Sequence, residues 1–279
     1  MYTAASYSES LKQIAGKVVA IVYIFEKEDA EGFHHYSVWK GDIIAHWLQA
    51  IQDIGCMPLL FDVRTFVEKA MNRSLPHIDC LINLNAGSTE LSPMALVPST
   101  CSFLGIPCIP CDAMTIVVGE NKELSNILAA HSAMKTPRSL KPDEDGGIFR
   151  PLNFGSSIGV RRGPQTMQNQ PGLYQEFING FDITTPLVYN PLKGEMDFFP
   201  TIAYVPDSSS NNWYFGENEK HTKSSYARII TSNIDKRYYD VVKSLVDSIG
   251  INTFCRIDAR VSLSSPINYE SVRQTQIAI

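Results

Sequence analysis

Hydrophobic residues in the first third of the chain fall alternately into short continuous runs and into helical periods. Lys17–Ile24 is a continuous apolar run rich in β-branched residues, which is typical of a buried parallel strand. Asp42–Gly55 instead carries apolar residues at three- and four-residue steps and ends on a glycine that suits a helix C-cap. Further strand-like runs follow at Met57–Val63, Asp79–Asn85 and Ile106–Ile109. This order predicts a β-α-β-α-β lobe built around a parallel sheet.

The pattern changes from Thr115 onward, where helical and strand-like segments no longer alternate regularly. An amphipathic helix is predicted over residues 121–132. Leu173–Tyr189 has the pattern of two alternating strands interrupted at Asn179–Gly180, a dipeptide that favours a β-hairpin. Phe198–Tyr204 is predicted as the next strand.

A polar stretch separates these strands from the last clear elements. Residues 206–225 are rich in Ser, Asn, Glu and Lys, and they predict a long mobile loop that would serve as a lid in an enzyme. Asp235–Ile249 follows as a helix whose apolar residues share one side, and Phe254–Val261 follows as a strand. The C-terminal part therefore mixes helices and strands without the regular order of the first lobe.

One stretch in the middle of the chain carries candidate anion-binding chemistry. Phe149–Val160 has the sequence F-R-P-L-N-F-G-S-S-I-G-V, which predicts a strand, a loop and a second strand. Glycine lets the backbone approach a ligand, and consecutive N–H groups together with the hydroxyls of Ser156 and Ser157 can bind an anion. Arg150 would add positive charge at the same place. Taken alone, such a pattern is more often an ordinary hairpin, so its meaning depends on the neighbouring segments.

Composition and charge narrow the function classes. With 44% hydrophobic and 19% charged residues, the chain has the composition of an ordinary soluble globular protein. A net charge of −5 argues against nucleic acid as the main partner, because nucleic acid favours a basic face. No apolar run approaches the roughly 18 residues of a membrane span, and the N-terminus does not have the pattern of a signal peptide.

The six cysteines are scattered through apolar segments, which fits reduced, buried thiols in a cytoplasmic protein. Cys108 and Cys111 have C-x-x-C spacing, but no second cysteine pair or histidine pair lies nearby in the sequence. Zinc or redox chemistry at these residues is therefore not expected.

Four features follow one another in a meaningful order. Lys122 begins a helix, Arg150 precedes the Gly-Ser-Ser loop, Gln175–Ile178 is followed by Asp182, and Arg256–Asp258 lies in the last clear strand. Their order and spacing resemble the ATP-grasp fold, and within it the D-alanine–D-alanine ligase-like group.

The resemblance is best from Asp79 to Asp258, and Leu104–Pro107 resembles the L-G-I-P segment that precedes the central lobe in that group. It implies an α/β and α+β architecture with an N-terminal parallel-sheet (pre-ATP-grasp) lobe, a small central lobe, and a C-terminal lobe that carries the lid loop. The expected bounds of these three domains are 1–113, 114–186 and 187–279.

The resemblance implies that two cations and a loop hold the phosphates of ATP. Lys122 and Arg150 would lie on two sides of the phosphates, and the loop of Ser156 and Ser157 would close over them. The group usually has lysine where Arg150 stands. Arginine keeps the charge and adds a fork that suits phosphate oxygens, so ATP binding is expected with a different geometry. Taken alone, Lys122 is more often a solvated helix lysine.

The nucleoside would lie against the segment that follows. The resemblance implies that Gln175, Glu176 and Ile178 line the adenine pocket, where strand backbone imitates base pairing. Asp182 would accept hydrogen bonds from the ribose hydroxyls, although it could also be no more than a polar strand residue.

Three further residues are implied in metal binding and catalysis. Asp258 would bind Mg²⁺, a hard cation that takes oxygen ligands and is commonly shared with phosphate. Arg256 would stabilise charge at the acyl centre, and Lys220 resembles the lid lysine that approaches the γ-phosphate. The ordinary interpretations are a strand-surface ion pair for Arg256 with Asp258 and a solvated loop for Lys220.

The sequence departs from the group at the second metal ligand. Ala278 stands where a metal-binding glutamate is expected, and the sequence stops before the asparagine that follows it in the group. Either Glu270 or another carboxylate substitutes, or the sequence lacks a tail, or metal binding is impaired.

These expectations describe a cytoplasmic, ATP- and Mg²⁺-dependent carboxylate–amine ligase that forms an amide bond through an acyl phosphate. Its partners would be small-molecule carboxylate and amine substrates, without nucleic acid or membrane, and a homodimer is a possible assembly. The loop Asn85–Glu90 would help to hold the carboxylate, and because it lacks the histidine of the cell-wall enzymes, amino acids or small peptides other than D-alanine are expected. The alternative is a non-catalytic nucleotide-binding protein of the same fold.

Overall fold

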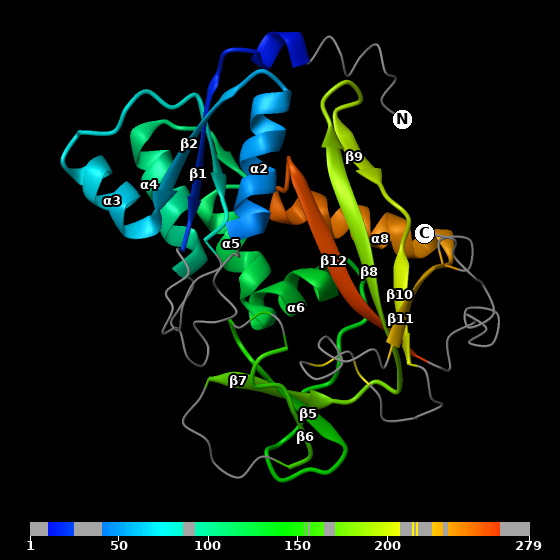
Figure 1. The fold of residues 1–279 in the computed structure, drawn as a ribbon. Helices are drawn as coiled ribbons and strands as arrows, with labels where there is room; N and C mark the ends of the chain where they lie inside the picture. Colours follow the sequence, from blue (N-terminus) through cyan, green and yellow to red (C-terminus); the bar gives the residue numbers. More distant parts are fainter. Residues whose placement is uncertain are drawn as a thin grey trace. The chain divides into compact units, whose positions relative to one another are not determined.

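The fold was obtained as a computed structural model of the chain, shown in Figure 1. The structure describes residues 11–24, 41–85, 93–153, 155, 157–164, 171–206, 214, 216, 225–230 and 234–262. The chain forms two compact units, Met1–Val117 and Val118–Ile279.

Four parallel strands form the sheet of the first unit. They are β1 (Val18–Tyr23), β2 (Met57–Asp62), β3 (Cys80–Asn83) and β4 (Cys108–Ile109), and they lie in the order β2-β1-β3-β4. Each pair of neighbouring strands is parallel, which confirms the predicted parallel sheet of the N-terminal lobe. The strand order reverses between β1 and β3, and ligands of open α/β sheets bind outside the carboxyl ends of strands at such a point.

The helices of this unit connect the strands. They are α2 (Gly41–Asp53), α3 (Val63–Met71), α4 (Leu96–Leu104) after a 3-10 turn at Pro93–Ala95, and α5 (Ala113–Glu120), which continues into the second unit. The predicted glycine cap of α2 is consistent with the left-handed backbone of Gly55, whose φ is 81°.

Both faces of the parallel sheet are buried. On one face Val22 packs with Phe66 of α3 and Val97 of α4, and on the other face Ile21 packs with Ile51 of α2. Successive strand residues point to opposite faces, so a strand covered on both sides must be apolar throughout. This explains why the first strand is a continuous apolar run rather than an alternating one.

The second unit begins with a capped helix and a three-stranded sheet. The side chain of Asn121 accepts hydrogen bonds from the backbone N–H groups of Glu123 and Leu124 and so caps α6 (Lys122–His131). The antiparallel strands β5 (Gly147–Pro151), β6 (Arg161–Arg162) and β7 (Gly172–Glu176) form the small sheet, in the order β6-β5-β7.

A larger antiparallel sheet, called the large sheet below, completes this unit (Figure 1). Its main order is β11-β10-β8-β12, and β9 pairs with β8. The strands are β8 (Gly180–Asn190), β9 (Glu195–Phe198), β10 (Ile202–Pro206), β11 (Ser225–Ile229) and β12 (Phe254–Ser262), and the helix that packs on them is α8 (Lys236–Ile249).

The large sheet has one buried face and one polar face. The odd-numbered residues of β8 form its core face, where Phe181 and Ile183 pack with Val205 of β10 and Leu187 packs with Val242 of α8. The even-numbered residues of β8 and β12 lie opposite, because strand side chains alternate. That opposite surface is called the site face below.

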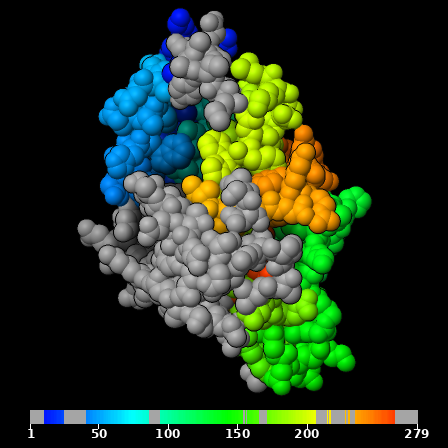
Figure 2. Space-filling view, turned by 90° about the vertical axis from the view of Figure 1, so that its right-hand side faces the viewer, coloured from blue at the N-terminus to red at the C-terminus, as the bar shows by residue number. Residues whose placement is uncertain are grey.

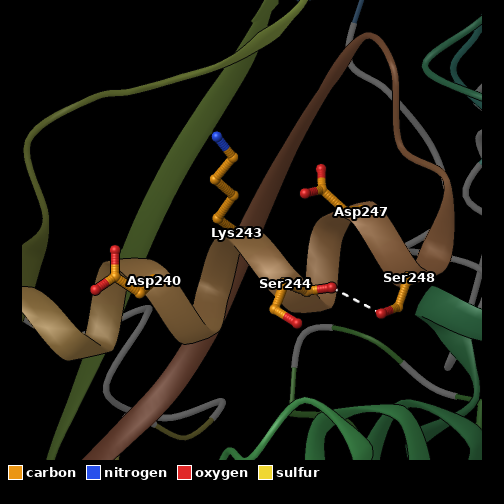
Figure 3. A pocket seen from close by; sticks show the side chains of 5 residues that line it. All are labelled: Asp240, Lys243, Ser244, Asp247 and Ser248. Carbon is orange, nitrogen blue, oxygen red and sulfur yellow. Dashed lines mark hydrogen bonds between the residues drawn. The ribbon is translucent and has the colours of Figure 1, made fainter.

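The exposed side of α8 lies next to β8 and β9. Figure 2 shows the orange residues of α8 on the surface beside the yellow-green residues of β8 and β9. A shallow hollow runs along this side of α8 and is lined by polar residues of that helix alone (Figure 3), namely Asp240, Lys243, Ser244, Asp247 and Ser248.

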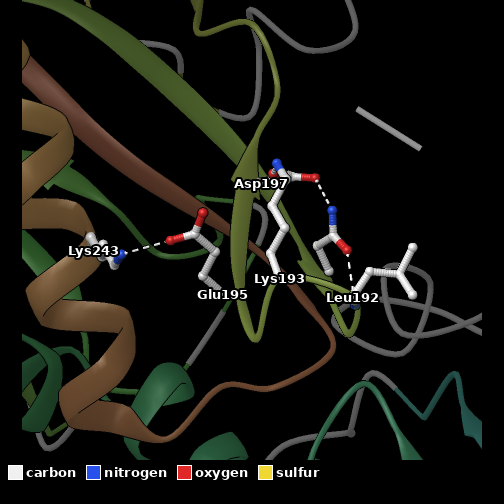
Figure 4. Close-up of polar contacts among 6 residues, drawn as sticks. Leu192, Lys193, Glu195, Asp197 and Lys243 are labelled. Atoms are coloured by element: carbon white, nitrogen blue, oxygen red, sulfur yellow. Dashed lines mark hydrogen bonds and ion pairs between the residues drawn. The ribbon is translucent and has the colours of Figure 1, made fainter. Parts of the chain in front are cut away.

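Polar contacts tie the turn between β8 and β9 together and join it to α8 (Figure 4). Lys243 of α8 forms an ion pair of 3.1 Å with Glu195, the first residue of β9. Asp197 accepts a hydrogen bond of 2.7 Å from the side chain of Asn190 and pairs with Lys193 in the turn. Because these pairs are solvated, each contributes little to stability.

The hairpin predicted at Asn179–Gly180 is wrong. The strands on its two sides, β7 and β8, belong to different sheets, so the chain crosses here from the small sheet to the large one. Gly180 serves close packing instead of a turn, because a Cβ at this position would lie 1.7 Å from the backbone oxygen of Val261 in β12.

The single strand predicted at Phe198–Tyr204 is also wrong. The chain leaves β9 after Phe198 and enters β10 at Ile202, so Pro200 lies in the break between two strands. Strand β11 was not predicted, since Ser225–Ile229 adjoins a polar stretch that resembles a loop.

The expected domain bounds can be compared with the two units only in part. The unit boundary at 117/118 lies close to the predicted boundary at 113/114. The predicted boundary at 186/187 falls inside β8, and the division of the second unit into a central and a C-terminal lobe stays a prediction.

Two simpler expectations concern thiols and membrane spans. None of the six cysteines, all of which lie in the described residues, forms a disulfide, which agrees with the expected reduced thiols. Within the ranges that the structure describes, no helix is long and apolar enough to cross a membrane.

Candidate functional site

The start of α6 is joined to the end of β5. The backbone N–H and the Nζ of Lys122 both donate to the carbonyl oxygen of Leu152, at 3.0 and 3.3 Å. The side chain of Asn121 donates to Asn153 Oδ1 at 3.0 Å. These contacts fix the predicted phosphate-binding lysine beside the segment that leads from Arg150 into the Gly-Ser-Ser loop.

Burial shifts the ionisation of Lys122 and of its neighbour Glu120. Desolvation and the charge of Arg150 lower the pKa of Lys122 to about 8, although Glu120 acts in the opposite direction. Desolvation raises the pKa of Glu120 to about 7, against the effect of Lys122. Glu120 Oε2 is buried and has no hydrogen-bond partner among the described residues. An anion bound beside Lys122 would offset the cost of burying its charge.

Arg150 connects the small sheet electrostatically to the large one. It is a partly buried residue of β5, and burial lowers its pKa. The charges of Asp182 on β8 and Asp258 on β12 act in the opposite direction, so both carboxylates lie within electrostatic reach of the guanidinium. Four predicted site residues from separate stretches of the chain, including Lys122, are therefore brought into one region.

The predicted phosphate loop consists of two successive turns. The N–H of Ile158 donates to the carbonyl oxygen of Gly155 at 3.1 Å, and the N–H of Val160 donates to that of Ser157 at 3.2 Å. Ser157 has a φ of 64°, a left-handed backbone that costs a residue with a Cβ about 1–2 kcal/mol. Strain of this kind is concentrated at ligand-binding turns. Ser156 lies outside the described residues.

The side chains of Gln175 and Glu176 lie on opposite faces of the small sheet and have different surroundings. Gln175 pairs with Ile148 and shares a face with Arg150, since the two lie an even number of residues apart in register. Gln175 is 2% exposed, and its Oε1 has no hydrogen-bond partner among the described residues. Glu176 points to the opposite face, where its side chain accepts a 2.9 Å hydrogen bond from the N–H of Arg138.

Ile178 lies in the crossover from β7 to β8, and Asp182 lies near the start of β8. The carbonyl oxygen of Ile178 accepts a 2.6 Å hydrogen bond from Arg260 Nε, and Asp182 Oδ2 accepts one of 2.8 Å from Arg260 Nη1. The ring of Phe177 lies under two guanidinium groups, with the central carbon of Arg162 3.4 Å and that of Arg260 4.7 Å from the ring centroid.

Asp258 is held in place on the site face of the large sheet. Arg256 approaches both of its oxygens at 2.8 Å, and Thr184 donates to Oδ1 at 2.7 Å. The side chains of Arg256 and Asp258 are 61% and 58% exposed, so this ion pair contributes little to stability. A well-ordered, solvent-facing carboxylate is a suitable ligand for a hard cation.

No protein-family model and no curated protein matches the sequence, but solved structures match the fold. The D-Ala:D-Ser ligase VanG from Enterococcus faecalis has a TM-score of 0.62 at 12% identity, over 89% of this chain and 87% of the ligase. D-alanine–D-alanine ligase from Bacillus anthracis has a TM-score of 0.63 at 14% identity, over 89% of this chain and 84% of that one. The same Bacillus enzyme complexed with ATP gives 0.61 at 13% identity, over 89% and 83%.

The chain has the ATP-grasp ligase fold. The predicted resemblance to the D-alanine–D-alanine ligase-like group is confirmed at the level of the fold. In the described part of this ATP-grasp fold, the predicted residues Lys122, Arg150, Asp182 and Asp258 come together, with Arg256 on Asp258. Lys220 and Ser156 lie outside the described residues, and the roles of all these residues stay predictions.

Sequence reasoning missed three contributors to this region. Thr184 is 4% exposed and positions Asp258, Arg260 holds Asp182, and Glu120 lies beside Lys122. A signal for Arg260 was present, because Arg256, Asp258 and Arg260 alternate along one strand and must share a face. The contacts of Thr184 and Glu120 depend on distant segments and leave no local pattern.

Two other places do not resemble the ATP-grasp site. The hollow on α8 (Figure 3) contains none of the predicted site residues. In the first unit, Asn83 and Asn85 are 7% and 3% exposed at the carboxyl end of β3, where the N–H of Asn85 donates to Asn83 Oδ1 at 3.1 Å. The rest of the loop predicted to hold a carboxylate, residues 86–90, lies outside the described residues.

Proposed function

We propose that the protein is an ATP- and Mg²⁺-dependent carboxylate–amine ligase. The observation that carries this proposal is the gathering of Lys122, Arg150, Asp182 and Asp258 in one region, where both carboxylates lie within electrostatic reach of Arg150. The region combines the partly buried cation Lys122 with the solvent-facing carboxylate Asp258. Bound phosphate would pair with the cation, and a bound metal would pair with the carboxylate. An ATP-grasp fold, one of whose solved examples is complexed with ATP, supports the same conclusion.

The residues present fit a nucleotide. Lys122 and Arg150 supply positive charge for phosphate oxygens, and their desolvation would be offset by an anion. Gln175 Oε1, a buried acceptor without a partner among the described residues, fits a donor such as the exocyclic amine of adenine. Ile178 would add a backbone contact to the base. We assign the side chain of Glu176 no contact with the base, since it points to the opposite face of the small sheet from Gln175.

The residues also fit a metal that is shared with the nucleotide. In the ranges described, no group of three or more His, Cys, Asp or Glu residues could hold a metal ion by itself. Mg²⁺ commonly takes one or two carboxylates together with phosphate oxygens and waters. Asp258 is the carboxylate that we assign to it, so metal would bind together with ATP rather than before it.

The chemistry supplied by Mg-ATP is phosphorylation of a substrate carboxylate, after which an amine displaces phosphate from the acyl phosphate and forms an amide. The protein contributes positioning and charge neutralisation, as in other phosphoryl transfers. Lys122 and Arg150 would hold the phosphates, and Lys220 would approach the γ-phosphate from the lid. Arg256 would stabilise negative charge at the acyl centre.

The substrates belong to the finer part of the proposal. The carboxyl ends of β1 and β3 in the first unit are where a ligand of an open α/β sheet binds. Tyr23, Asn83 and Asn85 lie there, and burial raises the pKa of Tyr23. We assign an amino acid or small peptide to this edge. Free thiols fit a reducing compartment such as the cytoplasm.

The experiment that tests the function is an ADP-release screen of the purified chain. Mg²⁺, ATP and pairs of amino acids are supplied, and each pair is compared with either amino acid alone. A ligase releases ADP only with a carboxylate acceptor, and the amide product forms only when an amine is present. ADP release that is independent of any amino acid would contradict a ligase and indicate a simple ATPase.

A second candidate is a non-catalytic nucleotide-binding protein. The specific observation in its favour is that both oxygens of Asp258 are already bound, by Arg256 and Thr184. ATP binding in a calorimeter without ADP release for any pair would support this candidate over the ligase.

A further inference from the structure

Arg260 makes an unusual number of contacts for one side chain. Its Nε donates to the carbonyl oxygen of Ile178 at 2.6 Å, its Nη2 to that of Gly180 at 2.9 Å, and its Nη1 to Asp182 Oδ2 at 2.8 Å. The side chain is only 15% exposed, and its guanidinium lies over the ring of Phe177. One planar group thus binds three acceptors and a ring within six consecutive residues.

The residues that Arg260 contacts include the segment through which the chain crosses from the small sheet to the large one. It leaves the small sheet at Glu176 and enters the large sheet at Gly180. Arg260 itself lies on β12, directly opposite Asp182 in the register of β8. Any loss of its contacts therefore acts on the crossover and on Asp182 at the same time.

Asp182 needs an external constraint to keep one orientation. Its side chain is 29% exposed, and a partly solvated aspartate retains rotamer freedom unless something binds it. A charge-assisted hydrogen bond from a buried guanidinium is short and directional enough to select one rotamer. A carboxylate has about four acceptor positions, so the bond to Arg260 does not use up Asp182 as an acceptor.

We infer that Arg260 is a positioning residue that sets selectivity for the ribose hydroxyls through Asp182. This inference rests on the proposed function, because it takes Asp182 as the residue that meets the ribose. Arg260 does not touch the nucleotide in this scheme. It orients the acceptor that does, and it acts on the phosphate-binding residue Arg150 only through the charge of Asp182.

A comparison of ligands separates this role from a general structural one. The purified full chain is titrated calorimetrically, with Mg²⁺, against ATP, 2′,3′-dideoxy-ATP and tripolyphosphate. We expect the native chain to bind ATP at least about tenfold more tightly than the dideoxy analogue. Arg260→Gln should reduce that ratio to about twofold or less, while tripolyphosphate affinity changes less than about twofold.

Three further variants test the route through Asp182. Asp182→Asn should lower the ratio as far as Arg260→Gln does, and the double variant should lower it no further, because residues that act as a unit are not additive. Arg260→Lys keeps the charge but cannot span three acceptors, so it should not restore the ratio. Arg237→Gln is the matched control, since this arginine is ion-paired to Asp235 with its side chain 86% exposed.

Each outcome decides the question. An unchanged ratio in a folded Arg260 variant would overturn the inference while leaving the proposed function standing. Equal losses for ATP and tripolyphosphate would show a merely structural role. If Arg260→Gln does not fold, Arg260→Lys and Asp182→Asn carry the same comparison. Failure of the native chain to bind ATP would overturn the proposed function itself.

Discussion

The two faces of the large sheet differ in what their residues do, although they alternate along the same strands. On the core face, the side chains of Phe181, Ile183 and Leu187 are at most 2% exposed. On the site face, Asp182, Thr184 and Asp258 bind charged or hydroxyl groups. One face contributes free energy of folding by removing apolar area from water. On the other face, the exposed Arg256–Asp258 ion pair contributes little to folding, and the proposed function assigns this face to ligand binding.

The sharpest test of this difference is Asp258→Asn. We expect turnover to fall by at least about 10³-fold, equivalent to about 4 kcal/mol of transition-state stabilisation, because the metal loses its charged ligand. The free energy of unfolding should change by less than about 1 kcal/mol, because the ion pair is exposed. ADP release with an established substrate pair and urea unfolding are the two measurements.

Asp197→Asn is its matched control, since Asp197 is an ion-paired carboxylate of the same unit (Figure 4). It lies opposite Val188, four residues along β8 from Thr184, the residue opposite Asp258. It should leave turnover unchanged. Full activity of Asp258→Asn would refute the assignment of Asp258 to the metal.

The reverse test is made on the core face. Phe181→Ala removes a ring that is 1% exposed and should cost about 3–5 kcal/mol of unfolding free energy. Urea unfolding followed by circular dichroism measures the loss. The fraction of chains that stay folded should keep their affinity for ATP within about threefold, a difference under 1 kcal/mol. A loss below 1 kcal/mol would contradict the division of labour between the two faces.

Arg150 tests whether the site extends to the small sheet. Arg150→Ala should weaken ATP binding at least about tenfold, or about 1.4 kcal/mol, because a partly buried cation at the phosphates is lost. Calorimetric titration gives the affinity directly. Arg237→Ala, at an exposed arginine, should leave it unchanged. Equal affinities of the native chain and Arg150→Ala would remove Arg150 from the phosphate site.

The smallest expected effect is a pH dependence of ATP binding. Lys122 has a pKa of about 8, so it is charged below that pH and loses its charge as the pH rises through it. Glu120, with a pKa of about 7, gains a negative charge over a lower range. Both changes oppose an anion, so the affinity for ATP should fall by about three- to tenfold from pH 7 to pH 9.

Calorimetry across this pH range tests the effect with two variants. Lys122→Arg should flatten the upper part of the profile, because arginine stays charged. Glu120→Gln should flatten the lower part. A profile of the native chain that does not change with pH would show that neither group faces the nucleotide.

The sequence predictions were accurate where a structure depends on neighbouring residues and failed where it depends on residues far apart in the sequence. The parallel strands and α6 were predicted because apolar runs and amphipathic periodicity are local signals. The alternation along β12 predicted that Arg256 and Asp258 share a face. The other features depend on tertiary contacts. The hairpin signal at Asn179–Gly180 failed because glycine is required at position 180 for close packing against Val261, 81 residues later, and not for a turn.

The contacts of Arg260 also bear on how the protein is made. Ile178 and Arg260 are 82 residues apart, so the crossover is synthesised well before the strand that holds it. At typical elongation rates of 5–20 residues per second, this delay is roughly 4–16 seconds. During that time β8 has β9 and β10 to pair with but presents an unpaired edge where β12 will lie. The joint between the two sheets is thus among the last parts of the second unit to form on the ribosome, and the nascent chain depends on its later residues to protect that edge from other chains.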